Sequence, residues 1–223
     1  MADDENPIKA SLAQPTPICA IGASAGGVAA LQALFRRLPC DLGLSYVIIL
    51  HLAPDQPSAL GEVLTMCTRM PVFQVQDRSV LKPNSVYVIA PDRELVIEGD
   101  NLSSRAFREP RGQRTPIDLF FHSIAAARGD GVAAVLSGTG SDGAQGIRAV
   151  KEAGGVIMVQ DPAEAEFAAM PQNAIATGVA DFIVPIAEMA ERLAEVARSK
   201  DAVRSLDVDA AANELRRIIG FLR

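Results

Sequence analysis

Tryptophan is absent from the 223 residues, and aromatic residues make up only 4% of them. Surfaces that stack bases or sugars need aromatic platforms, so the composition argues against both kinds of binding. The formal net charge of -6 gives no overall field that would attract nucleic acid or anionic lipid. We therefore expect no nucleic-acid partner.

Cysteine and long apolar runs are also scarce. The three cysteines, Cys19, Cys40 and Cys67, are odd in number and widely spaced, which suggests neither a disulfide framework nor a zinc site. No stretch approaches the roughly 18 apolar residues that span a bilayer. The acidic start, Met1-Ala2-Asp3-Asp4-Glu5-Asn6, is not a signal peptide. We expect a cytoplasmic protein without membrane insertion.

What is present is an alternation of short apolar runs and helix-like segments. The runs are solid rather than alternating, as expected for parallel strands covered by helices on both faces. The sequence thus predicts a three-layer, doubly wound α/β fold with a mostly parallel sheet. The expected strands lie at 17–21, 46–50, 132–136, 156–160 and 181–184, and the expected helices at 28–38, 57–70, 115–128, 144–153 and 186–197.

The middle of the chain departs from this alternation. Short strand-like pieces at 72–75, 85–90 and 94–97 predict a small inserted hairpin or meander. Residues 99–115 read as a long surface loop. This loop is basic, through Arg105, Arg108, Arg111 and Arg114, and either meets an acidic partner or is simply solvated.

The expected domain organisation has three parts. Residues 1–15 form a polar, flexible tail, residues 16–198 the catalytic domain, and residues 199–223 a linker and an amphipathic helix. That helix either packs back on the domain or binds a partner. Its apolar positions are Val208, Ala211, Leu215, Ile218, Ile219 and Leu222.

The strongest local pattern is Gly22-Ala23-Ser24-Ala25-Gly26-Gly27, which follows an expected strand and opens an expected helix. Gly-x-Ser-x-Gly is typical of a turn that exposes a serine nucleophile. The backbone N–H groups at the start of the helix would suit a developing oxyanion. The same pattern also fits a phosphate-binding turn or simple close packing, so it leaves three interpretations open.

A serine nucleophile needs a base, and the chain has two histidines. His51 directly follows an expected strand, and the carboxyl ends of parallel strands meet at one edge of a sheet. His122 lies within an expected helix, which favours a structural role. An orienting carboxylate must then be found among Asp142, Asp92 and Asp161, all at strand ends, and the pattern alone does not choose between them.

Taken together, these residues resemble the catalytic domain of the CheB family of protein-glutamate methylesterases, over about residues 16–197. The blocks that carry the resemblance occur in order along the chain. They are Ile21-Gly22-Ala23-Ser24-Ala25-Gly26-Gly27, His51-Leu52-Ala53-Pro54, Val86-Tyr87-Val88-Ile89-Ala90-Pro91, Pro116-Ile117-Asp118-Leu119-Phe120, Leu136-Ser137-Gly138-Thr139-Gly140-Ser141-Asp142-Gly143 and Met170-Pro171-Gln172-Asn173-Ala174.

The resemblance implies a Ser24–His51–Asp142 triad that hydrolyses glutamate methyl esters on chemoreceptors, releasing methanol, with glutamine deamidation in many members. It implies no metal or organic cofactor. The oxyanion pocket would include Ala25, Gly26 and Thr139. Many relatives carry Thr at the position of Ala25 and Met at that of Thr139, so the pocket is expected to differ in detail.

The resemblance also bears on regulation. The phospho-receiver domain usual in the family is not found before residue 16, so regulation by aspartyl phosphorylation is not expected from this chain. The sequence around Asp142 (residues 136–143) and the tail at 214–223 resemble those of hybrid proteins in which this domain is fused to a receptor methyltransferase. We therefore expect the chain to be a fragment of such a protein. Methyltransferase and regulatory domains, fused or separate, are thus expected partners, along with a methylated chemoreceptor.

Two other functions fit the same residues. The chain would be a non-catalytic binding module if the glycine-rich edge held a phosphate ligand or docked a partner. It would be a small-molecule esterase if the triad acted on simple esters instead of proteins.

Overall fold

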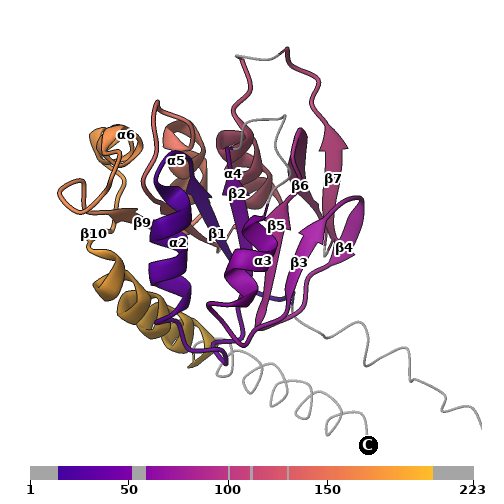
Figure 1. Cartoon of the computed structure of the whole chain (residues 1–223), viewed down its shortest axis with the longest axis horizontal. Helices are drawn as coiled ribbons and strands as arrows, with labels where there is room; N and C mark the ends of the chain where they lie inside the picture. Colours follow the sequence, from indigo (N-terminus) through magenta and orange to yellow (C-terminus); the bar gives the residue numbers. More distant parts are fainter. Residues whose placement is uncertain (1–14, 52–58, 100, 111–112, 130, 203–223) are drawn as a thin grey trace, which may run out of the picture.

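The computed structural model describes residues 15–51, 59–99, 101–110, 113–129 and 131–202. Its centre is a seven-stranded sheet in which every pair of neighbouring strands is parallel (Figure 1). From one edge to the other the strands are β10 (Phe182–Val184), β9 (Val156–Gln160), β8 (Val132–Val135), β1 (Ile18–Ala23), β2 (Ser45–Leu50), β5 (Ser85–Ile89) and β3 (Val72–Val75).

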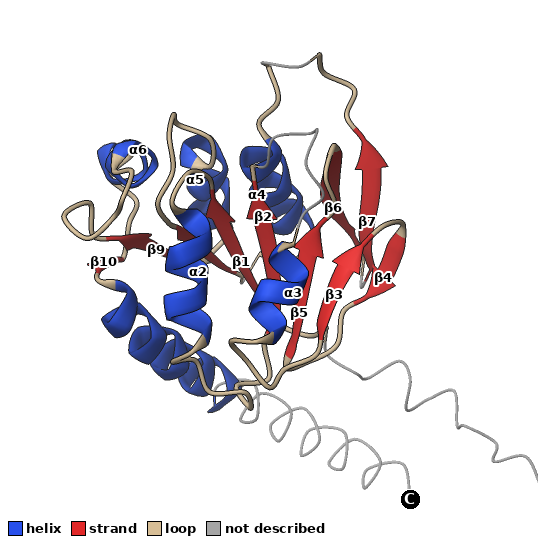
Figure 2. Cartoon of the chain, viewed as in Figure 1, coloured by secondary structure: helices blue, strands red, loops and turns tan. Residues whose placement is uncertain are grey.

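Helices cover both faces of this sheet, with α2 and α3 in front of it and α4 and α5 behind it (Figure 2). The strands are buried on both faces because their side chains alternate between two cores: Cys19 and Ile21 pack on one side, and Ile18 and Ala20 on the other. The first core includes α2 (Gly27–Phe35), α3 (Leu60–Thr65) and the helix at 186–202, and the second α4 (Pro116–Ala127), α5 (Ala144–Glu152) and α6 (Ala169–Ala176). The predicted three-layer α/β fold is confirmed.

The insertion differs from the predicted hairpin. Two of the expected pieces, β3 and β5, belong to the main sheet, and the insertion is a separate antiparallel sheet of β4 (Arg78–Val80), β7 (Asn101–Ala106) and β6 (Arg93–Glu98). Strand β7 lies inside the segment predicted to be a surface loop, so that prediction was wrong for residues 101–106.

The reason is that β7 is polar in sequence, Asn-Leu-Ser-Ser-Arg-Ala, and its strand conformation comes from its neighbours. It pairs with a strand on each side, and Leu102 is fully buried beneath the insertion. The signal that would have located it is the Gly99-Asp100 pair, since Glu98 is paired directly with Asn101 and such dipeptides are typical of two-residue hairpin turns.

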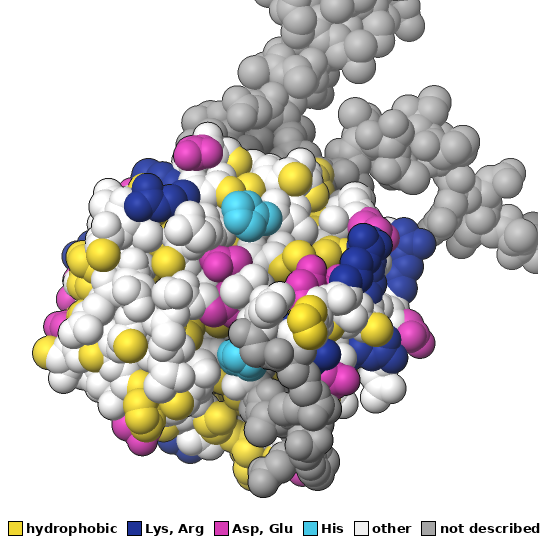
Figure 3. All heavy atoms as spheres, turned by 90° about the horizontal axis from the view of Figure 1, so that it is seen from above, with side chains coloured by type: hydrophobic (Ala, Val, Ile, Leu, Met, Phe, Trp, Pro, Cys, Tyr) yellow, Lys and Arg dark blue, Asp and Glu magenta, His cyan; other side chains and the backbone are white. Residues whose placement is uncertain are grey.

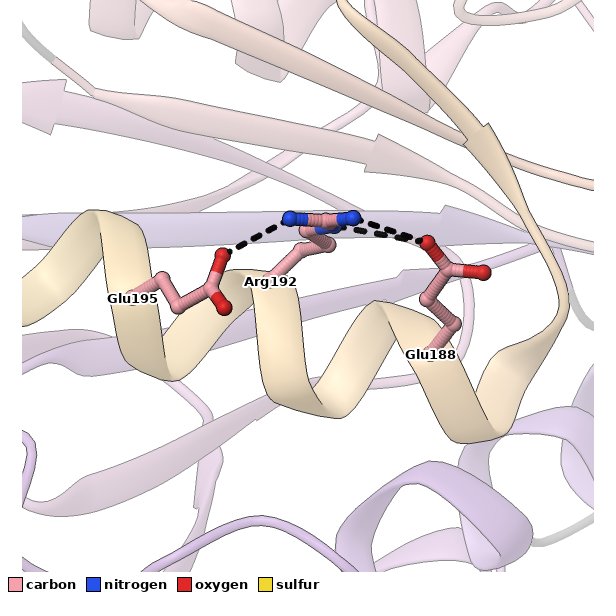
Figure 4. A network of polar contacts seen from close by, with 3 residues as sticks. All are labelled: Glu188, Arg192 and Glu195. Carbon is pink, nitrogen blue, oxygen red and sulfur yellow. Dashed lines mark hydrogen bonds and ion pairs between the residues drawn. The ribbon is translucent and has the colours of Figure 1, made fainter.

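The last described helix continues to residue 202, past its expected end at Ala197. On this helix Arg192 forms ion pairs with Glu188 (3.2 Å) and Glu195 (3.0 Å), as Figure 4 shows. Glu195 is exposed, and Glu188 and Arg192 are partly exposed, so water screens the pairs and they stabilise the helix only slightly. Most of the predicted N-terminal tail and the amphipathic helix at 207–223 lie outside the described residues.

The order of the strands reverses next to β1. From β1 the chain builds outward through β2 on one side, and later through β8, β9 and β10 on the other. In open parallel sheets, a crevice forms at such a reversal, outside the carboxyl ends of the strands, and ligands bind there. The position of the candidate site is therefore set by the point between β1 and β8.

Two helical glycines predict opposite effects of the same substitution. At Gly146 in α5, a Cβ atom would lie 2.5 Å from the Cβ of Phe121 and 2.9 Å from the carbonyl oxygen of Asp118, so α4 and α5 touch there. We expect Gly146→Ala to lower the free energy of unfolding by about 1–3 kcal/mol through overpacking. At Gly61 in α3 an added Cβ would meet no described atom within 4 Å outside its chain neighbours and the backbone of its own helix, and Gly61→Ala should raise the free energy of unfolding by up to about 1 kcal/mol.

Urea unfolding of both variants, followed by circular dichroism, measures these changes. Equal stabilisation by the two substitutions would contradict the close packing of α4 on α5.

Candidate active site

Ser24 follows directly after β1, in a tight turn that leads into α2. Its backbone N–H donates to the carbonyl oxygen of Ser137 (3.0 Å), and its own carbonyl oxygen accepts the N–H of Gly27 (2.9 Å). The first bond joins the ends of β1 and β8 and so holds Ser24 at the reversal of strand order. The serine hydroxyl has no hydrogen-bond partner among the described residues, and its side chain is partly exposed.

Gly26 makes this turn possible. It has φ of 70°, in the left-handed region that favours glycine, and a Cβ there would lie 2.6 Å from the hydroxyl of Ser137 and 2.8 Å from the Cβ of Glu166. The backbone N–H groups of Ala25 and Gly26 have no acceptor in the described part of the chain. They lie at the N-terminal end of α2, where the partial positive charge of the helix favours an anion.

His51 follows directly after β2, the neighbour of β1. Its backbone N–H donates to the carbonyl oxygen of Ala23 (3.1 Å), which fixes its backbone beside the serine turn, and its side chain is exposed. Within the residues that the structure describes, no hydrogen bond joins the side chains of Ser24 and His51. His122 is exposed on α4. Figure 3 shows both histidines and several acidic side chains on this face of the molecule.

Asp142 lies just past β8, on the other side of β1. Its carboxylate accepts the N–H groups of Ile117 (3.1 Å) and Asp118 (2.9 Å) at the start of α4. The N-cap of α5, the helix that follows Asp142, is Gly143, so Asp142 caps α4 and not its own following helix. Burial raises the pKa of Asp142 to about 6, against the opposing effect of the two amide hydrogen bonds.

The two rival aspartates are engaged elsewhere. Asp92 follows β5, which is not a neighbour of β1, and it is an exposed residue that pairs with Arg114. The carboxylate of Asp161 accepts the N–H of Ala163 (2.8 Å) in its own turn. Asp161 follows β9, which is not a neighbour of β1 either. Of the three aspartates, only Asp142 follows a strand that pairs with β1.

Ser137 is the residue that sequence reasoning missed. Its hydroxyl donates to the carbonyl oxygen of Ala25 (2.9 Å) and accepts the N–H of Phe167 (3.0 Å), while its backbone N–H donates to the side chain of Gln160 (2.8 Å). It thereby joins the serine turn, the end of β8 and the segment after β9. No sequence signal gave this role, because serine is common in turns, and Leu-Ser-Gly-Thr-Gly has the composition of an ordinary turn.

The remaining expectations concern the pocket and the basic segment. Thr139 is exposed in the turn between β8 and Asp142. Two of the segment's arginines are engaged within the chain: Arg105 pairs with Glu98, and Arg114 pairs with Asp92 and stacks on Phe107. Arg108 is exposed, and Arg111 lies outside the described residues. Two of the four arginines therefore already have an acidic partner within the chain.

Metal-binding clusters, membrane-spanning helices and surface hollows bear on what else the described part of the domain could bind. Among the described residues, no three His, Cys, Asp or Glu side chains form a group that could hold a metal ion, and no helix is long and apolar enough to cross a membrane. Two hollows of about 590 and 560 Å³ lie beside the C-terminal end of α2. That is the end of the helix opposite Ser24.

Known proteins resemble this chain in sequence and in fold. A relative in Leptospira interrogans, named as a protein-glutamate methylesterase/protein-glutamine glutaminase, is 32% identical over 173 residues, 77% of this chain and 90% of that protein. A protein-glutamate methylesterase/protein-glutamine glutaminase of Burkholderia lata is 38% identical over 185 residues, 81% of this chain and 53% of its own. This chain therefore spans about half of the Burkholderia protein.

The same domain also occurs within a much larger protein. An uncharacterised 104.1 kDa protein of Rhodobacter capsulatus is 42% identical over 137 residues, which are 61% of this chain but 14% of that protein.

The crystal structure of the Thermotoga maritima CheB methylesterase catalytic domain superposes with a TM-score of 0.75 at 24% identity, over 82% of this chain and all of that one. A profile of the family described as CheB methylesterase matches residues 19–193. The family expected from the sequence is confirmed, and with it the expectation of a hydrolase. The chain belongs to the CheB methylesterase family.

Proposed function

We propose that this chain hydrolyses glutamate methyl esters on a chemoreceptor-type protein and releases methanol, with Ser24, His51 and Asp142 as a catalytic triad. The observation that carries the proposal is the strand order β8-β1-β2, because Ser24 and His51 directly follow β1 and β2, and Asp142 lies in the turn that follows β8 at the reversal of the sheet. The names of the relatives supply the substrate class, and they support glutamine deamidation as a second activity.

In the proposed mechanism, His51 removes the proton of the Ser24 hydroxyl, which attacks the ester carbonyl carbon. The oxyanion that forms is stabilised by the unpaired N–H groups of Ala25 and Gly26. Methanol leaves with a proton from His51, and water then hydrolyses the acyl-enzyme. The Ser24 and His51 side chains are not hydrogen-bonded in the described structure, and such bonds commonly tighten only when substrate is bound.

Asp142 orients and stabilises the imidazolium in this proposal. Its carboxylate already accepts two amide hydrogens, yet each carboxylate oxygen can accept two hydrogen bonds, so acceptor capacity for His51 remains. The pocket is completed by Thr139 on the β8 side. A methylated receptor is the proposed partner, and control of the activity would come from separate or fused domains.

Replacing the nucleophile should abolish turnover while the fold survives. We expect Ser24→Ala to lower methanol release from a methylated receptor by about 10³-fold or more, since the partly exposed hydroxyl makes no described contact that supports the fold. Ser141→Ala is the matched control, because Ser141 is exposed at the same edge of the sheet. Full turnover by Ser24→Ala would refute the proposed nucleophile.

A fluorophosphonate probe gives a second measurement, since it should label the wild type and not Ser24→Ala. If the probe fails to label the wild type and a nucleotide raises its melting temperature, the chain is a binding module instead. Turnover of simple methyl esters as fast as that of the receptor would indicate a small-molecule esterase.

The raised pKa of Asp142 predicts the pH dependence of stability. The folded state holds this proton more tightly than the unfolded chain does, because burial raises the pKa from 3.8 to about 6. Protonation therefore favours folding, and the free energy of unfolding should decrease as pH rises from about 4 to about 6. Asp142→Asn should remove that part of the decrease, as measured by urea unfolding at a series of pH values. An unchanged slope in the variant would contradict the assignment.

A further inference from the structure

Helices α4 and α5 exchange caps. Asp142, just before α5, accepts the N–H groups of Ile117 and Asp118 at the start of α4 (3.1 and 2.9 Å). In return Asp118, in the first turn of α4, accepts the N–H groups of Gln145 and Gly146 at the start of α5 (3.0 and 2.7 Å). The first N–H groups of a helix have no acceptor within it, so each helix depends on a carboxylate from the other.

The local residues do not provide these caps themselves. The N-cap positions of the two helices are Thr115 and Gly143, and neither makes a side-chain capping hydrogen bond. Gly146 lets the helices approach closely, since a Cβ there would lie 2.9 Å from the carbonyl oxygen of Asp118. The direction of the Asp142 carboxylate therefore depends on how α4 sits against α5, which Asp118 helps to fix.

We infer that Asp118 is a positioning residue for the proposed reaction, and that it holds the Asp142 carboxylate in place through this exchange of caps. The inference rests on the proposed function, in which Asp142 orients His51. Asp118 itself bonds to the N-terminal amides of α5 and is assigned no contact with substrate.

Charge gives Asp118 a second effect on Asp142. The negative charge of Asp118 adds to burial in raising the pKa of Asp142. On the neighbouring elements, α4 carries His122 one turn beyond Asp118, the first charged residue of α5 is Arg148, and His51 directly follows β2. Among these residues only Asp118 is acidic, and its own backbone N–H is one of the two that bond to Asp142.

The test uses Asp118→Asn, which removes the charge but keeps an oxygen that can accept the N–H groups of α5. Asp118→Ser is a second neutral variant with a shorter capping side chain, and Asp118→Ala removes the cap. Glu152→Gln is the control: it removes one negative charge from the far end of α5, about 12 Å along the helix and beyond the screening length of physiological salt.

Two quantities are measured on the whole chain. Carbon-13 NMR follows the titration of the Asp142 carboxyl, assigned by its loss in Asp142→Asn, and kcat/KM for methanol release is measured from pH 5 to 9. We expect Asp118→Asn and Asp118→Ser to lower the pKa of Asp142 and to move the acid limb of the kcat/KM profile to lower pH. Asp118→Ala should lower kcat by about tenfold to hundredfold with little change in KM.

A merely structural role predicts a different result. In that case the neutral variants lower the melting temperature but leave both the pKa of Asp142 and the pH profile where Glu152→Gln leaves them, and the inference is overturned. If the wild type releases no methanol, the proposed function fails on its own. The NMR titration still decides whether Asp118 acts on Asp142.

Discussion

The hydrogen bond from the N–H of Ser24 to the carbonyl oxygen of Ser137 holds together the part of the molecule on which its chemistry depends. Strands β1 and β8 are neighbours in space, yet more than a hundred residues separate them along the chain. This bond extends their pairing past the end of the sheet, into the two turns that carry the candidate nucleophile and its candidate carboxylate. The hydroxyl of Ser137 then binds the serine turn to the segment after β9.

The solid apolar strands and amphipathic helices were predictable, because burial on two faces leaves a clear sequence pattern. Ser24 and His51 were identified for a related reason, since each follows such a strand directly. The order of the strands was not predictable, because the pairing of β1 with β8 depends on packing between distant segments. Choosing Asp142 over Asp92 from the sequence therefore required the resemblance, whereas the structure separates them by strand position.

Strand β7 and Asp118 show two further limits of the sequence. The polar residues of β7 have no strand pattern of their own, and they become a strand because partners lie on both sides. Asp118 resembles an ordinary acidic residue in the first turn of a helix, a position favoured by the helix dipole. Its bonds to Gln145 and Gly146 exist only because α4 and α5 are packed side by side.

The cap that Asp142 gives to α4 also constrains how the family can diverge. A descendant that no longer needed catalysis would still lose two hydrogen bonds at the start of α4 if it replaced this residue. Selection for folding alone would then favour a side chain that accepts these hydrogen bonds at position 142, aspartate among them, after the activity had gone. The presence of that aspartate in a relative is therefore weaker support for catalysis than the presence of the serine, whose hydroxyl bonds to none of the described residues.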